Sequence, residues 1–188
     1  MDGRWAQSTA VEPEAVATDA RELAFVRFVE SRLTEHYRLA AVILGDPIDA
    51  QAAVHDAFEG AWRTGPDPRD LDRFDAWVGR SLVDECRDRL RRRSRPPVTD
   101  ISERLRETLA APDQLGSAID RDEVERAFAA LDPDQQIAIA LRFYADLTVD
   151  QIAERVGAAV GTVSSRLHHA LAAMNAEFAR ATRAEGLR

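Results

Sequence analysis

Residues 148–167 read TVDQIAERVGAAVGTVSSRL, and this stretch decides the fold of the C-terminal part of the chain. Thr148 is followed three residues later by Gln151, a capping-box pattern that begins a helix. Gly157 is typical of the turn that ends such a short helix. Apolar residues then return at helical spacing over 160–167. A short helix, a glycine turn and a longer helix predict a helix-turn-helix.

The second helix of such a motif can enter the DNA major groove with its N-terminal residues towards the bases. Residues 132–174 contain five acidic residues and three arginines. Because phosphate contacts dominate non-specific affinity for DNA, we expect this unit alone to bind weakly and to need a second contact. We expect exposed base-reading side chains at Thr162, Ser164, Ser165 and Arg166, and phosphate contacts from His168 and His169.

Further helices are predicted on the N-terminal side of this motif. Asp132 and Pro133 suit the N-cap and first position of a helix whose apolar face continues to Tyr144. Earlier in the chain, amphipathic helices are expected at about 21–44, 49–62 and 72–95, the second with Asp49 as its N-cap. Three such helices with short connections are sufficient for a small bundle.

No segment alternates with a period of two over a useful length, so the sequence predicts no sheet. The expected fold is all-α, with two small helical domains joined by a flexible linker. The predicted parts are a flexible tail at 1–20, a helical domain at 21–95, a linker at 96–119, a helix-turn-helix domain at 120–180 and a tail at 181–188.

The composition excludes several classes of protein. The 188 residues are 45% hydrophobic and 31% charged, the ordinary balance of a globular protein. The single cysteine, Cys86, cannot form an internal disulfide, and we expect it to be a small buried hydrophobic residue. The longest purely apolar run is Leu39–Leu44, far below the roughly 20 residues that cross a bilayer. We therefore expect a cytoplasmic protein without membrane insertion.

The net charge of −8 hides an asymmetry along the chain. Arg87–Arg95 contains six arginines and one aspartate, at the end of the third predicted helix. We expect this cluster to bind phosphate without reading sequence. Trp62 and Trp77 lie on the apolar faces of their helices, so we expect both to pack in the core rather than stack on bases.

The two units together resemble the extracytoplasmic-function (ECF) sigma factors of bacterial RNA polymerase, over roughly residues 25–95 and 120–178. Their order and the linker between them also resemble that family. The motifs of the second unit are ALDPDQQ (130–136), LRFY (141–144), LT (147–148), QIAE (151–154) and GTVSSRLH (161–168). Those of the first unit are GD (45–46), AF (57–58), AWR (61–63), FDAW (74–77) and DRLRRR (88–93).

The resemblance implies a protein that directs core RNA polymerase to promoters, with no cofactor, no metal and no catalysis of its own. The helix Ala50–Trp62 would dock on the clamp helices of the largest polymerase subunit. The loop Thr64–Arg73 and the helix Phe74–Arg93 would meet the minus-ten element, and Val160–Met174 the minus-thirty-five element. The linker would run towards the RNA exit path. The polymerase flap and an anti-sigma factor are further partners that it implies.

Two groups of site residues follow from this resemblance. The candidate polymerase contacts are Gln51, His55, Asp56, Glu59 and Arg63. In addition to the residues of the helix-turn-helix, the candidate DNA contacts are Arg80, Arg87, Arg89, Arg91, Arg92 and Arg93.

Several residues depart from the family pattern. Ala52 and His55 replace an acid and a glutamine, and Val83 and Asp84 stand where the family often has arginine and asparagine. In the reading helix, residues that are usually basic are replaced by Ser164, His169 and Leu171. The departures predict an unusual promoter, a lower DNA affinity or a need for an accessory protein.

Two alternatives to a sigma factor stay open from the sequence. One is a helix-turn-helix regulator that acts without polymerase. The other is a diverged sigma-like chain that occupies polymerase or a partner without opening DNA. An unrelated helical enzyme is disfavoured because the sequence has no acid–base pair, phosphate loop or cluster of metal ligands in a recognisable motif.

Overall fold

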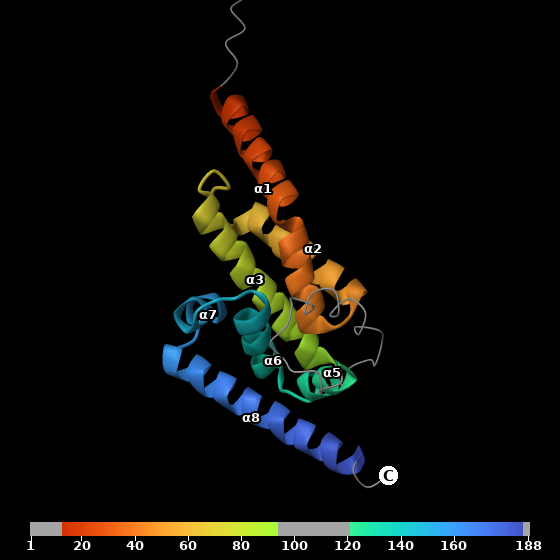
Figure 1. Cartoon of the computed structure of the whole chain (residues 1–188). Coiled ribbons are helices and arrows are strands. Elements are labelled where there is room, and N and C mark those ends of the chain that lie inside the picture. The colour runs from red at the N-terminus through yellow and green to blue at the C-terminus, as the bar shows by residue number, and fades with distance from the viewer. Residues whose placement is uncertain (1–12, 94–120, 186–188) are drawn as a thin grey trace, which may run out of the picture.

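The computed structural model describes residues 13–93 and 121–185, and within them every regular element is a helix (Figure 1). The all-α prediction is confirmed. The predicted linker at 96–119 lies outside the described residues. The elements are α1 (Pro13–Leu44), α2 (Pro47–Thr64), α3 (Leu71–Arg92), α5 (Arg121–Ala129), α6 (Pro133–Ile139), η1 (Ala140–Tyr144), α7 (Val149–Val156) and α8 (Val160–Glu185).

Both terminal helices are longer than the sequence indicated. α1 begins at Pro13, so residues 13–20, which we assigned to a tail, are helical. α8 likewise continues to Glu185, into the segment assigned to the C-terminal tail. The helical pattern that we used to place boundaries depends on an apolar face, and short polar extensions of a helix carry no such signal.

The first unit is a bundle of α1, α2 and α3 around an aromatic core. Phe28 of α1 and Phe74 of α3 are fully buried, and their rings meet edge to face with centroids 4.8 Å apart. Phe58 of α2 packs on Phe28 at 5.7 Å. One aromatic side chain from each helix therefore fixes how the three helices pack.

The connection between α1 and α2 corrects one prediction. The N-cap of α2 is Asp46, not Asp49, because the Asp46 carboxylate accepts hydrogen bonds from the backbone N–H groups of Ile48 and Asp49 at 2.8 and 2.9 Å. Pro47 follows at the first helical position, where its missing N–H has no consequence. Asp49 is left free to pair elsewhere.

Trp62 and Trp77 are half-buried rather than fully buried. The Trp62 ring lies 4.9 Å from that of Phe25, and the guanidinium carbon of Arg21 stands 4.1 Å from its centroid. Trp77 packs against the hydrophobic core. Both rings therefore contribute to the core, as predicted, although each keeps an exposed part.

The second unit contains the helix-turn-helix that the sequence predicted. Thr148 and Gln151 form a complete capping box at the start of α7, and Asp132 and Gln135 form another at the start of α6. Gly157 ends α7 in the left-handed conformation, with φ of 65°. Buried apolar side chains of α7 and α8, among them Ile152 and Val163, hold the two helices together.

The helix that begins at Pro133 does not continue regularly to Tyr144. It widens after Ile139 into the π-helical turn η1, which ends with a hydrogen bond from the Ala145 N–H to the Ala140 carbonyl at 3.1 Å. Asp146 follows with φ of 52°. η1 contacts α1, so this irregular turn lies where the two units meet.

The two units pack against each other. α3 contacts α6 and α7, and Figure 1 shows α8 running across the far side of these helices from α3. The buried apolar side chains of both units form one contiguous cluster. The two-domain chain therefore has a closed arrangement, in which the end of α3 faces the helix-turn-helix unit.

Gly157→Ala is expected to lower the free energy of unfolding by about 1–2 kcal/mol, because an L-residue is strained at positive φ. A Cβ at this position meets no atom within 4 Å, so the loss reports backbone conformation alone. Gly161→Ala is the matched control, since Gly161 also has open space but lies inside α8. Urea unfolding measures both; equal stability of the two variants would contradict the assignment of this turn.

Candidate nucleic-acid interface

The five candidate polymerase contacts lie together on one exposed face of α2. Their spacing in sequence places them on successive turns, and all five are exposed. Apolar residues of the opposite face, such as Val54 and Phe58, are buried against the other helices of the bundle. The packing of the first unit thus leaves this polar face exposed, although Asp56 also pairs with Arg89 of α3. Its members are Gln51, His55, Asp56, Glu59 and Arg63.

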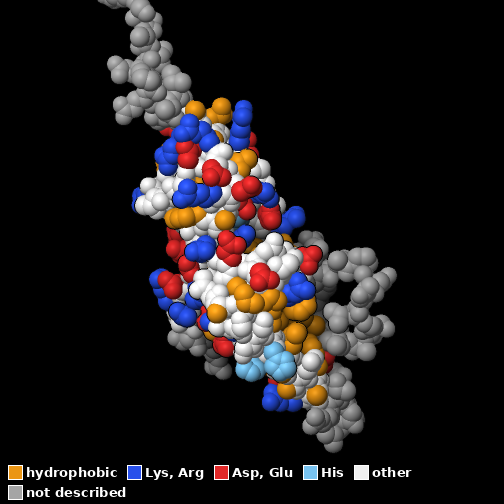
Figure 2. Space-filling view, turned by 90° about the vertical axis from the view of Figure 1, so that its left-hand side faces the viewer, with side chains coloured by type: hydrophobic (Ala, Val, Ile, Leu, Met, Phe, Trp, Pro, Cys, Tyr) orange, Lys and Arg blue, Asp and Glu red, His pale blue; other side chains and the backbone are white. Residues whose placement is uncertain are grey.

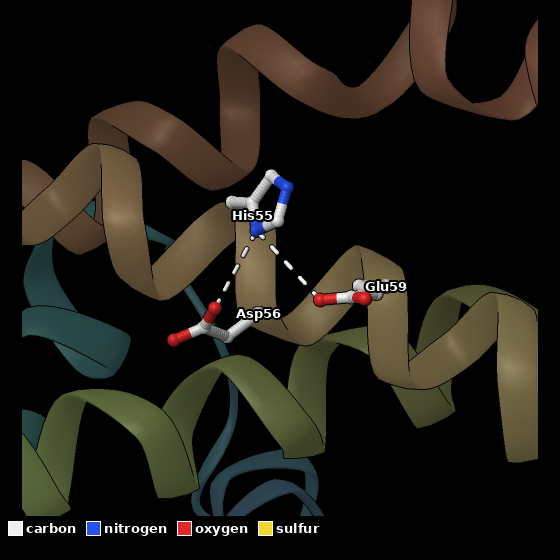
Figure 3. A group of neighbouring side chains, drawn as sticks. All are labelled: His55, Asp56 and Glu59. Carbon is white, nitrogen blue, oxygen red and sulfur yellow. Dashed lines mark hydrogen bonds and ion pairs between the residues drawn. The ribbon is translucent and has the colours of Figure 1, made fainter.

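His55, Asp56 and Glu59 form a compact group within this face (Figure 3). The His55 Nδ1 atom lies 3.4 Å from an Asp56 oxygen and 3.9 Å from a Glu59 oxygen. Three such ligand atoms can hold a metal ion in principle, but each carboxylate already has a cationic partner. Asp56 pairs with Arg89 at 2.5 Å and Glu59 with Arg63 at 2.7 Å. We assign no ion to this group.

The ion pair with Arg89 also affects the pKa of Asp56. Partial burial raises the pKa of Asp56, but hydrogen bonds from Arg89 and His55 outweigh this and leave the pKa below its usual value. The carboxylate therefore stays charged to lower pH in the folded chain. Because Arg89 is on α3, this ion pair ties the candidate polymerase face to the arginine cluster.

The arginine cluster is divided among three environments. Arg89 and Arg93 turn inward, with side chains only 15% and 14% exposed. Arg93 donates to the Leu44 carbonyl at 2.5 Å and pairs with Asp49. These two arginines therefore fasten α3 to α2 and to the turn before it.

Three other arginines of α3 reach the second unit. Arg80 donates to the Glu154 carbonyl at 2.9 Å, in the last turn of α7. Arg87 Nε lies 2.8 Å from an oxygen of Asp134, at the start of α6, and Arg91 lies 3.7 Å from the other oxygen. Only Arg87, with a side chain 14% exposed, is largely shielded by protein, whereas Arg80 and Arg91 also keep exposed parts.

Arg92 occupies the third environment. Its side chain is 79% exposed and lies 3.8 Å from Asp88 on the same helix. A long exposed side chain near a single aspartate is held weakly and can move to a phosphate at little cost. Arg92 therefore has the setting that a DNA contact requires.

The helix-turn-helix presents most of its predicted readers to solvent. Arg166 is the exception, since it is half-buried and its Nη2 atom lies 3.1 Å from Asp134. A cleft of about 650 Å³ lies between the starts of α6 and α8, with Arg91 of α3 at its wall beside Asp134 and Arg166. The exposed readers are Thr162, Ser164, Ser165, His168 and His169.

The charge on the surface shown in Figure 2 agrees with the net charge of −8. Figure 2 shows acidic and basic side chains interspersed over the face that it presents, with no continuous basic band. A protein with this surface has little long-range attraction for DNA. Any binding of DNA phosphate must therefore come from a few local arginines.

The loop between α2 and α3 is ordered by local contacts. The Arg69 side chain donates to both oxygens of Asp67, which also accepts from the Arg69 backbone N–H at 2.9 Å. These hydrogen bonds lower the pKa of Asp67 to about 2. Pro68 is buried beneath them. The loop that the resemblance assigned to the minus-ten element therefore contains a hydrogen-bonded turn at Asp67–Arg69.

The sequence analysis singled out several arginines that join the two units, but as DNA contacts, and it did not predict their partners in the other unit. Asp134 pairs with residues 47 and 32 positions away, and Arg155 packs on Gly79 of α3. Nothing in the local pattern marks such contacts, because they depend on how two separate units dock.

Comparison with known proteins agrees with the two-unit arrangement. A family model for sigma-70 region 2 matches residues 28–96, and one for sigma-70 region 4 matches residues 121–174. An ECF RNA polymerase sigma factor, SigL of Mycobacterium tuberculosis, is 31% identical over 142 residues, which cover 73% of this chain and 79% of SigL. The chain belongs to the ECF sigma factors.

Other relatives agree with this membership. The RNA polymerase sigma-E factor of Streptomyces coelicolor is 29% identical over 159 residues, covering 83% of this chain and 86% of that protein. The solved structure of CnrH in complex with the cytosolic domain of CnrY matches with a TM-score of 0.60 and 24% identity, covering 86% of this chain and 92% of CnrH, and so supports the fold. As a sigma factor, the protein acts in promoter recognition by RNA polymerase.

The family boundaries correspond to the structural ones. The region 2 match covers the bundle from within α1 to the end of α3, and the region 4 match covers α5 to the middle of α8. Among the described helices, none is both long and apolar enough to span a membrane.

Cys86 lies in the middle of α3 and is completely buried. Burial raises the pKa of its thiol to about 12, against weaker opposing effects of Arg89 and Arg93. The thiolate is the reactive form, so the folded sigma factor holds an inert cysteine.

Iodoacetamide at pH 8 is expected to modify Cys86 in the native protein about a thousandfold more slowly than in urea, because the thiolate fraction falls by that factor. Mass spectrometry of timed samples measures both rates. Comparable rates in native buffer and in urea would contradict the burial of this side chain.

Proposed function

We propose a division of labour among three surfaces of this sigma factor. The exposed face of α2 docks on the clamp helices of the largest polymerase subunit. The end of α3 and the preceding loop meet the minus-ten element, and the start of α8 reads the minus-thirty-five element. The observation that supports this most is that α2 exposes a five-residue polar face, of which only Asp56 pairs with another helix.

The DNA contacts are individually weak. Arg92 and the hydroxyl-bearing readers of α8 are exposed, but the second unit has more acidic than basic residues. Two weak contacts become effective when one polymerase holds both, because the second contact is then intramolecular. Unstacking a base costs a few kcal/mol, which such a tethered pair can supply together with the polymerase.

Membership of the ECF sigma factors also suggests two further partners, the polymerase flap and an anti-sigma factor. The region 4 unit contacts the polymerase flap, and an anti-sigma factor holds the free chain, as a partner domain accompanies CnrH in its solved structure. The chain works in the cytoplasm beside the polymerase, without a cofactor, a metal or catalysis of its own.

The two alternatives, a regulator that acts without polymerase and a decoy, require different properties of the protein. A regulator that acts without polymerase needs strong DNA affinity of its own, which the mixed surface charge does not favour. A decoy would bind polymerase and give no transcript. Run-off transcription with core polymerase on a library of promoter sequences separates the decoy from an active sigma factor, and promoter-dependent transcripts are the result expected here.

Gln51→Arg combined with Glu59→Arg is expected to weaken binding to core polymerase about tenfold or more, because two positive charges enter the docking face. Both side chains are exposed, so the thermal unfolding of the free chain should change little. Glu22→Arg with Glu30→Arg, on the exposed side of α1, is the matched control. Equal affinity of both double variants in a polymerase titration would sink the assignment of this face.

Arg92→Ala is expected to weaken the binding of holoenzyme to promoter DNA and to reduce the slope of log affinity against log salt by about 1. Arg180→Ala removes the same charge from the far end of α8 and should leave the slope unchanged. Fluorescence anisotropy at several salt concentrations measures both. An unchanged slope for Arg92→Ala would mean that this side chain does not touch phosphate.

A further inference from the structure

Arg89 links two acidic side chains of neighbouring helices. Its Nη1 atom donates to the carboxylate of Glu85, one turn earlier in α3, and to the Glu85 carbonyl at 3.2 Å. Its Nη2 atom lies 2.5 Å from an oxygen of Asp56 on α2. The Arg89 side chain is only 15% exposed, whereas those of Glu85 and Asp56 are 39% and 46% exposed. A largely buried guanidinium, fixed by its own helix, therefore binds an exposed acid on the polar face of α2.

The two oxygens of Asp56 have different partners. The Oδ2 atom binds Arg89, and the Oδ1 atom lies 3.4 Å from the Nδ1 atom of His55 (Figure 3). The same His55 atom lies 3.9 Å from a Glu59 oxygen. Because Arg89 holds one oxygen of the carboxylate in a charge-assisted hydrogen bond, the direction of the other oxygen is also set. Arg89 thus orients a side chain that belongs to the polar face.

Asp56 has little other restraint on its orientation. Its one further partner, His55, is 72% exposed. Two exposed side chains at this distance hold each other weakly, because water and salt screen their interaction. Without Arg89, the Asp56 carboxylate would exchange among the rotamers open to an exposed side chain.

Arg89 does not have the setting of a DNA contact. Two carboxylates, those of Asp56 and Glu85, share its single positive charge, so the group as a whole is negative and repels phosphate. Arg92, in the next turn of the helix, is 79% exposed and lies 3.8 Å from a single aspartate. Of these two arginines, Arg92 is the one whose surroundings suit DNA.

We propose that Arg89 is a positioning residue for polymerase docking, which from α3 holds the Asp56 carboxylate in the orientation that binds polymerase. The inference rests on the proposed function of the α2 face. A carboxylate that is already oriented loses less side-chain freedom on binding, and this raises affinity without a new contact. A residue of the arginine cluster thereby contributes to polymerase binding while it contacts neither polymerase nor DNA.

A double-mutant cycle on the full chain tests this role. Arg89→Gln, Asp56→Asn and the double variant are titrated with core polymerase, after circular dichroism and urea unfolding have shown that each is folded. We expect each single variant to bind about fivefold more weakly, and the double variant to bind no more weakly than Asp56→Asn. A merely structural loosening by Arg89→Gln would add its own loss in the Asp56→Asn background.

Arg89→Lys repeats the cycle with the positive charge preserved, so that the test does not depend on the folding of Arg89→Gln. A lysine ammonium lacks the rigid fork that binds two acids at once. We expect this variant to bind polymerase about threefold more weakly, and only where Asp56 is present.

Asp49→Asn is the matched control. It breaks the ion pair with Arg93 that also joins α2 to α3, and it leaves the five residues of the docking face unchanged. Its affinity for core polymerase is expected to stay within twofold of that of the unmodified chain.

Promoter binding separates positioning from phosphate contact. It is measured at several salt concentrations with polymerase in excess, so that each variant is fully assembled. Arg89→Gln is expected to keep the slope of log affinity against log salt, whereas a lost phosphate contact would reduce the slope by about 1.

Non-additive losses in the cycle, together with an unchanged salt slope, would support the proposal. Additive losses, full affinity of either single variant, an equal loss in Asp49→Asn or a reduced slope would overturn it. Failure of the proposed function is distinguishable, because it would appear as full affinity of Gln51→Arg combined with Glu59→Arg, which leaves Arg89 and Asp56 in place.

Discussion

The packing of the two units depends on the acidic groups that compensate the charges of a few arginines. Arginine is always ionised, and burying its guanidinium requires an acidic or carbonyl partner. In this sigma factor the largely buried Arg87 pairs with Asp84 of its own helix and with Asp134 of the other unit, across the surface where α3 meets α6. The same carboxylate also holds Arg166 of the recognition helix. A single ion cluster therefore joins α3 to the helix-turn-helix unit.

The arginine cluster of α3 has three roles that its sequence alone does not separate. Arg89 and Arg93 build the first unit by pairing with acids of α2, while Arg92 is exposed. The net charge of −8 and the mixed surface keep general attraction for DNA low. A sigma factor benefits from this balance, because a free chain that bound DNA strongly would occupy promoters without polymerase.

Local chemistry made the helices and their ends predictable. Some features act over a few residues, so they can be recognised directly in the sequence. They are the capping box of Thr148 and Gln151, the left-handed turn at Gly157 and the helical spacing of apolar residues in α2. Asp46 caps α2 in the structure, whereas the sequence analysis chose Asp49. Both acids stand close to Pro47, and the sequence pattern does not choose between them. The π-helical turn at Ala140–Tyr144 and the contacts of Asp134 depend on packing between distant segments. The family resemblance suggested the surfaces, and the arrangement of the two units showed which arginines pair with acids and that Arg92 is largely exposed.

The most direct measurement is the distance between the two units in the free chain and in the holoenzyme. Spin labels at Glu30→Cys of α1 and Ala172→Cys of α8 lie at exposed positions, and the buried thiol of Cys86 is expected to stay unlabelled. Pulsed electron–electron double resonance then gives the distance distribution. The closed arrangement predicts one narrow distribution for the free chain and a longer distance once core polymerase is bound. A broad distribution in the free chain, or the same distribution in both states, would contradict it.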